Sequence, residues 1–281
     1  MDLSKFTTPT FNNDAIENFT FDNSSSVDML TIETIPDLIQ FIGYAKYISS
    51  NYMIMLRGQN EAYKTLKPSL LRNNNKVQSL VSKWNKRITR LKKSYWPNLS
   101  IDNETLGALL QHYGFKTPFL DVVDNIWVAL WFATHKTTTA IADAHEHIIF
   151  SENDREFSYI LLLRSDAVLP DRNEKGVYEG DETRLVDLRK AVPSIYLRPH
   201  AQHAYIMIDK RSDSFDYSDY VVAIVKIPTN KGLEWIGNGA LLSTASLLPS
   251  AVFDSGYRHL LKTSDIPTEE IEVYGSIQII S

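Results

Sequence analysis

"LLQHYGFKTPFLDVVDNIWVALWFA", residues 109–133, places two helix signals around one short extended piece. The first signal is an apolar stripe at helical spacing, which predicts a helix over residues 104–113 with His112 on the flank of the stripe. Gly114 follows where a left-handed C-terminal cap is expected. The stripe consists of Leu106, Leu109, Leu110 and Tyr113.

The extended piece is expected to end at Asp121, and a second helix follows it. Residues 125–135 are apolar around nearly the whole helical wheel, which predicts a helix buried on most sides. Asp124 or Asn125 could cap it. Asp121 could hold backbone amides or reach a site.

Upstream, the apolar run 52–56 predicts a strand that ends before Arg57-Gly58-Gln59. Arginine offers five donors in a rigid fork that suits phosphate or carboxylate. Glycine lets a ligand or another strand approach the backbone closely. The alternative is an arginine that closes the strand with an internal ion pair.

Working outward, the patterns predict an N-terminal arm over residues 1–27, lying on the domain or partly ordered, and a single domain over 28–281. Helices precede strands along most of the chain, which predicts an α+β fold with a mixed, mainly antiparallel sheet. Residues 136–156 are polar and predict a surface loop or an insertion. Further helices are expected over 34–48, 77–94 and 231–242, and strands over 27–33, 159–164, 204–208, 220–227 and 271–280.

The composition argues against several classes of protein to which the chain could belong. Of 281 residues, 43% are hydrophobic, so the chain can bury a sizeable core and is not disordered throughout. A net charge of −5 argues against general binding to nucleic-acid backbone. Without cysteine there is neither a disulfide framework nor a thiol nucleophile. No apolar run reaches the roughly 18 residues of a membrane span, and nothing resembles a signal peptide, so we expect a cytoplasmic protein.

A third polar group precedes the predicted strand 204–208. Arg198, His200, Gln202 and His203 crowd before it in "YLRPHAQHAYIMI", residues 196–208. If the strand extends to them, Gln202 and His203 face opposite sides. Such residues fit the rim of a sheet, where sites gather, or an ordinary polar loop.

Four blocks together resemble the FRG domain, a family named for a Phe-Arg-Gly motif and found in bacterial and phage proteins. The blocks are "LRGQ…LKPSLLR", "LLQHYGFKTPFLD…NIWVALWFA", "RPHAQHAY" and "SLLPSAVFDSGYRHL", within residues 30–265. Leu56 stands for the family's phenylalanine, and Pro118 stands where the family has an arginine. Any role of that arginine is therefore in doubt here.

The layout is similar to the ADP-ribosyltransferase fold, which implies an NAD or nucleotide cleft. By this resemblance Arg57 binds phosphate or ribose, while Asp121 and Gln202 position the reacting ribose. Gln202 cannot be a general base, so Asp121 would supply the carboxylate. The remaining cofactor-binding candidates are Gly58, Gln59, His112, Tyr113, Thr117 and Arg198.

The same resemblance suggests a toxin or phage-defence role, with an antitoxin or another protein as partner. A non-enzymatic nucleotide sensor or adaptor is the alternative. "LLSTAS" at 241–246 with Glu270 and Glu272 offers a rival mapping onto arginine-directed transferases. His145 and His147 could chelate a metal on a strand, but in a polar loop we expect no metal.

Overall fold

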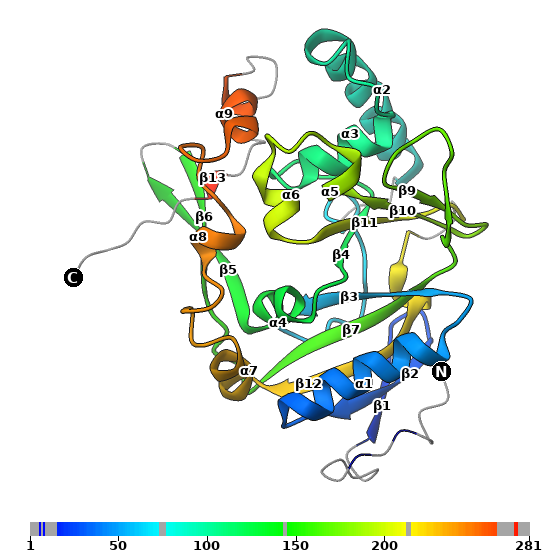
Figure 1. Ribbon diagram of the computed structural model, residues 1–281, viewed down its shortest axis with the longest axis vertical. Coiled ribbons are helices and arrows are strands. Elements are labelled where there is room, and N and C mark those ends of the chain that lie inside the picture. Colours follow the sequence, from blue (N-terminus) through cyan, green and yellow to red (C-terminus); the bar gives the residue numbers. More distant parts are fainter. Residues whose placement is uncertain are drawn as a thin grey trace.

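The computed structural model describes residues 6, 8, 16–72, 77–142, 145–211, 215–262 and 273–274, with backbone alone at 139–142, 145–147 and 273–274. Within these residues, a ten-stranded sheet forms the centre of the molecule (Figure 1). Neighbouring strands are antiparallel except β2 and β12, which run parallel. The predicted α+β class with a mixed, mainly antiparallel sheet is confirmed.

In spatial order the strands are β1 (Ile16–Thr20), β2 (Ser26–Thr31), β12 (Val221–Pro228), β7 (Phe157–Ser165), β3 (Met53–Gln59), β4 (Leu120–Val123), β11 (Ala204–Asp209), β10 (Thr183–Asp187), β9 (Val177–Glu179) and β8 (Leu169–Pro170). β1 lies inside the segment expected to be an arm, and it pairs with β2.

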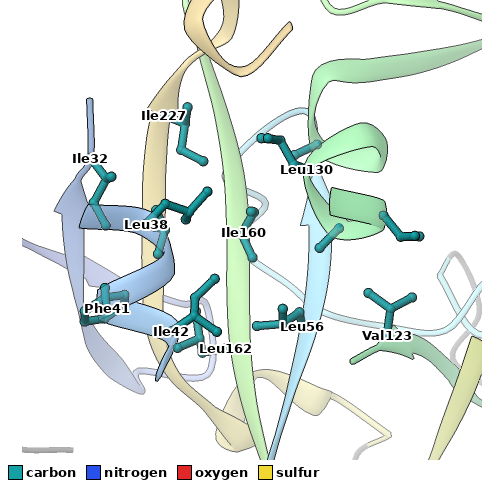
Figure 2. Packing of buried hydrophobic residues seen from close by; sticks show 14 of the residues in the cluster. Ile32, Leu38, Phe41, Ile42, Leu56, Val123, Leu130, Ile160, Leu162 and Ile227 are labelled. Atoms are coloured by element: carbon teal, nitrogen blue, oxygen red, sulfur yellow. The ribbon is translucent and has the colours of Figure 1, made fainter. Parts of the chain in front are cut away.

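The four longest of the described helices fall into two pairs, one in the upper part and one in the lower part of the view in Figure 1. α1 (Ile35–Ile48) and α4 (Ile126–Thr134) pack against β12, β7 and β3 through one apolar cluster, in which Leu38 and Phe41 lie beside the strand residues (Figure 2). α2 (Val77–Tyr95) and α3 (Asn103–Gln111) pack near β10 and β11 in a second cluster. The shorter helices are α5 (Leu188–Ala191), α6 (Leu197–Ala201), η2 (Tyr217–Tyr220), α7 (Thr229–Trp235), α8 (Thr244–Leu247) and α9 (Ser255–Leu261).

Side chains cap both α1 and α4, and the second cap is one of the two that the sequence predicted. Thr34 caps α1 and accepts from the Asp37 amide, while Asn125 caps α4 and accepts from the Trp127 and Val128 amides. Gly114 has a φ of +102°, as the expected left-handed turn after α3 requires. The sequence therefore placed the ends of these helices correctly.

Gly58 has a different role from the one expected. A Cβ at this position would lie 1.9 Å from the carbonyl oxygen of Ala129 and 2.6 Å from the amide nitrogen of Ala133. The backbone of α4, and not a ligand or another strand, makes the close approach. Gly58 thus fixes the most apolar helix against the central strand.

Three expectations about element boundaries were wrong. β3 does not end at Leu56, because the next three residues continue the ladder with β7. The extended piece at Asp121 continues to Val123 for the same reason, since β4 pairs with β11. Gln202 is not in a strand; it caps the C-terminus of α6.

The polar segment 136–156 was also misjudged. It forms a hairpin of β5 (His135–Ala142) and β6 (His145–Glu152), with β13 (Val273–Tyr274) beside β6. Its threonines favour strands because they are β-branched, which was a signal in the sequence. Among the described residues, no helix combines the length and apolar character needed to cross a membrane.

Candidate functional site

A polar cavity lies where β3 and β4 meet the end of α3 and the β5–β6 hairpin. It consists of two adjoining compartments of about 330 and 410 Å³, within the range of small-molecule sites. Arg57, Gly58 and Arg72 line both compartments, and Phe132, Thr137 and Phe150 complete the shared wall. The first compartment is also lined by Gln111, His112, Asp121, Gln202 and Leu248. The second compartment is also lined by Gln59, Asn60, Tyr63, Lys67, His135 and Lys136.

Arg57 lies at the junction of the compartments, at the end of β3. Its Nη1 donates to the backbone carbonyl of Asp121 over 2.7 Å. The buried Nε has no partner among the described residues. Burial lowers the Arg57 pKa, and the nearby Asp121 carboxylate opposes that shift. The guanidinium is thus directed by a carbonyl and keeps donors for a ligand.

His112 is held in one tautomer by a chain of two hydrogen bonds. The Gln202 amide nitrogen donates to the Leu247 carbonyl over 2.9 Å, and a carbonyl can only accept. The Gln202 oxygen must therefore accept from His112 Nδ1, 2.9 Å away. Burial lowers the His112 pKa, although Asp121 and Gln202 oppose the shift. Neutral His112 consequently has its lone pair on Nε2.

That lone pair faces a second acceptor. Nε2 of His112 lies 3.5 Å from Oδ1 of Asp121, and neither atom has a hydrogen-bond partner in the described part of the chain. Two acceptors at this distance need a proton or a donor group between them.

Tyr113 and Arg198 do not reach the cavity. Arg198 is fully buried, and its guanidinium lies over the rings of Tyr113 and Tyr257, at 4.9 and 4.1 Å from their centroids. The Tyr113 hydroxyl donates to Asp254 over 2.6 Å, and burial raises its pKa. Arg198 also donates to the His112 carbonyl over 3.2 Å, which connects it to the site.

Thr117 also lies behind the cavity wall. It is fully buried, donates to the Gln111 side-chain oxygen and accepts from the Phe119 amide. Its hydroxyl therefore supports the turn before β4 and helps to orient Gln111. Gln59, in contrast, is 8% exposed and lines the second compartment with its Oε1 unpartnered among the described residues.

Sequence reasoning missed Arg72 and Gln111. Arg72 ends the quoted block "LKPSLLR", yet nothing in its spacing separates it from a surface arginine. Arg72 comes close to Arg57 only in the folded chain, where both residues line the same two compartments. The coulombic effect of Arg72 contributes to lowering the Arg57 pKa.

The structure describes only part of the residues that belong to the rival transferase mapping and to the alternative metal site. Ser243 and Ser246 form a capping box at α8, which gives "LLSTAS" a structural role. Glu270 and Glu272 lie outside the described residues, as do the side chains of His145 and His147. Among the residues whose side chains are described, no group of three or more His, Asp or Glu is placed to hold a metal ion.

Comparison with known proteins supports the resemblance noted above. The FRG domain model matches residues 53–141, which include Arg57, Arg72, His112 and Asp121. Gln202 lies beyond the matched segment. Neither a curated protein nor a solved structure matches the chain.

Proposed function

We propose that the two-compartment cavity binds NAD or a closely related nucleotide, and that the protein transfers or hydrolyses its ADP-ribose group. The supporting observation is that Arg57, Arg72, His112 and Asp121 line one cavity. The guanidinium groups are donors for phosphate, and the Asp121 carboxylate, whose side chain is 43% exposed, is an acceptor for ribose hydroxyls.

The phosphate side of the proposal rests on charge. Arg57 and Arg72 line both compartments, and Lys67 and Lys136 line the second. None of the described residues that line the second compartment carries a carboxylate. Guanidinium forks bind phosphate oxygens in pairs, so a diphosphate would lie at the junction, against Arg57 and Arg72.

The reaction side rests on His112 and Asp121. In the proposed step, the bond between ribose C1′ and the nicotinamide nitrogen breaks, and its electron pair leaves with nicotinamide. An oxygen of water or of an acceptor hydroxyl forms the new bond to C1′. His112 Nε2 would take the proton of that oxygen, because the neutral tautomer has its lone pair there. The Asp121 carboxylate would stabilise positive charge on the ribose.

Binding and chemistry are tested separately. NAD at 100 times its dissociation constant should raise the free energy of unfolding by about 2.7 kcal/mol. Chromatography should detect nicotinamide released from NAD, and Asp121→Asn should abolish the release while largely keeping the affinity. Absence of a thermal shift with both NAD and ADP-ribose would refute the proposal.

A second candidate is a nucleotide sensor without chemistry. Its support is Gln202, whose amide is engaged at both ends, by Leu247 and by His112. By the resemblance alone, Gln202 would correspond to the acid of the ADP-ribosyltransferase fold. Asp121 is then the only carboxylate among the described residues of the first compartment. NAD binding without nicotinamide release would favour the sensor.

The biological setting follows from the resemblance alone. We propose a cytoplasmic toxin or phage-defence protein, with an antitoxin or another protein as partner. Expression in bacteria tests this role: the wild type should slow growth or restrict phage, and Asp121→Asn should do neither.

A further inference from the structure

A separate pocket lies at the other end of α4, away from the residues of the proposed NAD cavity. Its volume is about 370 Å³, and we call it the tryptophan pocket. It is lined by Asn125, Trp127, Val128, Ala201, His203, Trp235, Ile236, Leu241 and Leu242. None of these residues is an acid, a lysine or an arginine, and most of the wall is apolar.

His203 in this wall has an unusual backbone. Its φ is +50°, in the left-handed region that favours glycine, at the position after the C-cap residue of α6. Histidine is one of the side chains enriched in this region, so the turn after α6 accommodates His203 and places it in the pocket wall.

A hydrogen bond from Arg189 fixes the tautomer of the His203 ring. Nη1 of Arg189 donates to His203 Nδ1 over 2.9 Å, and arginine cannot accept a hydrogen bond. Arg189 is itself fixed by Asp187 and Asp124, both at 2.9 Å. Nδ1 is therefore the acceptor, and the ring proton is on Nε2. The side chain is 42% exposed, so His203 offers an N–H donor at the pocket wall.

The other polar side chains of the wall also offer donors. Asn125 Oδ1 already accepts from the Trp127 and Val128 amides, which leaves the Asn125 amide nitrogen for a ligand. The indoles of Trp127 and Trp235 can only donate. A ligand that fits this wall is flat and apolar, with an acceptor of its own.

We infer that the tryptophan pocket is a second binding site, for a planar aromatic molecule that carries a carbonyl acceptor. Aromatic faces would pack against Trp127 and Trp235, and the carbonyl would accept from His203 Nε2. The site is independent of the proposed NAD chemistry, because none of its lining residues lines either compartment.

The test uses matched bicyclic probes on the full chain. 1-Indanone carries a carbonyl acceptor, whereas indole of similar size carries only a donor. In spectra of protein with ¹⁵N-labelled tryptophan, 1-indanone should shift the indole signals of Trp127 and Trp235, and the signals of the buried Trp84 and Trp131 should stay in place. One neutral hydrogen bond corresponds to about fivefold tighter binding of 1-indanone than of indole.

Variants of His203 separate the acceptor contact from simple apolar binding. His203→Gly suits the left-handed backbone and removes the donor, so the preference for 1-indanone should disappear. His203→Asn also tolerates that backbone and restores a donor, so it should keep part of the preference. Equal affinity of the wild type for both probes, or shifts that avoid Trp127 and Trp235, would overturn the inference.

Discussion

Arg57 and Arg198 both belong to polar motifs that the sequence presents in the same way, yet the fold uses them differently. Arg57 lies on the wall of the two-compartment cavity, whereas Arg198 is fully buried against the rings of Tyr113 and Tyr257. Motif spacing brings an arginine near a site. Whether it faces the ligand or supports the wall is decided by what packs around it.

The largest effect is expected at the buried arginine. Arg198→Met removes two cation–π contacts and the bond to the His112 carbonyl, so the free energy of unfolding should fall by about 4 kcal/mol. Urea denaturation measures the loss. Arg198→Lys keeps the charge without the flat fork, and it should recover only part. A loss below about 1 kcal/mol for Arg198→Met would remove the contrast with Arg57.

The strand that presents Arg57 depends on the next residue. Gly58→Ala would place a methyl group 1.9 Å from the Ala129 carbonyl oxygen, which forces α4 away and should cost about 3 kcal/mol. Gly43→Ala is the matched control, because nothing lies within 4 Å of its added Cβ inside α1. That variant should gain up to about 1 kcal/mol. Equal effects would contradict the assigned role of Gly58.

Local sequence signals predicted the longer helices and the strands β2, β7, β11 and β12 closely, but they missed how far β3 and β4 extend. The helix expected over residues 231–242 also ends early, at Trp235. The apolar wheel of 125–135 and the stripe around Leu106 are properties of short segments, and both helices formed. The ladder that extends β3 through Gln59 needs β7, which lies about a hundred residues later in the chain. A short segment carries no information about such a partner.

The same limit applies to the site. Arg57, His112, Asp121 and Gln202 were all selected from motifs, and all line the first compartment. Tyr113 and Thr117 share the motif of His112, but they point into the protein because consecutive residues of a turn face different directions. Arg72 could be found only after the chain had folded.

A smaller effect on stability, with a large effect on binding, is expected at Arg57, which lines the cavity. Arg57→Gln should lower the affinity for ADP-ribose about 100-fold, because charge-assisted bonds to phosphate are lost. The free energy of unfolding should change by less than about 1 kcal/mol, since the variant loses one bond to a carbonyl. Calorimetric titration measures the affinity, and Arg258→Gln on α9 serves as a remote control. A large loss of stability in Arg57→Gln would show that both arginines are structural.

The smallest effect is expected at His112, which lines the cavity and accepts a hydrogen bond from Arg198 through its backbone carbonyl. Burial lowers the His112 pKa, and the charge of Arg198 acts in the same direction. The folded state therefore disfavours protonation, so stability is full above the unfolded pKa of about 6.5 and falls as the pH drops through the lower folded value. His135 also has a lowered pKa through burial, so some of the fall remains without His112.

His112→Asn isolates the contribution of His112, because the amide can still donate to Gln202 but cannot titrate. Between pH 7.5 and 5.5 the melting temperature of the wild type should fall more steeply than that of the variant. A shallower fall in the wild type than in the variant would mean that folded His112 is protonated and paired with Asp121, because a raised folded pKa stabilises the folded state as the pH drops. In that case Nε2 would carry a proton, and the acceptor pair would not exist.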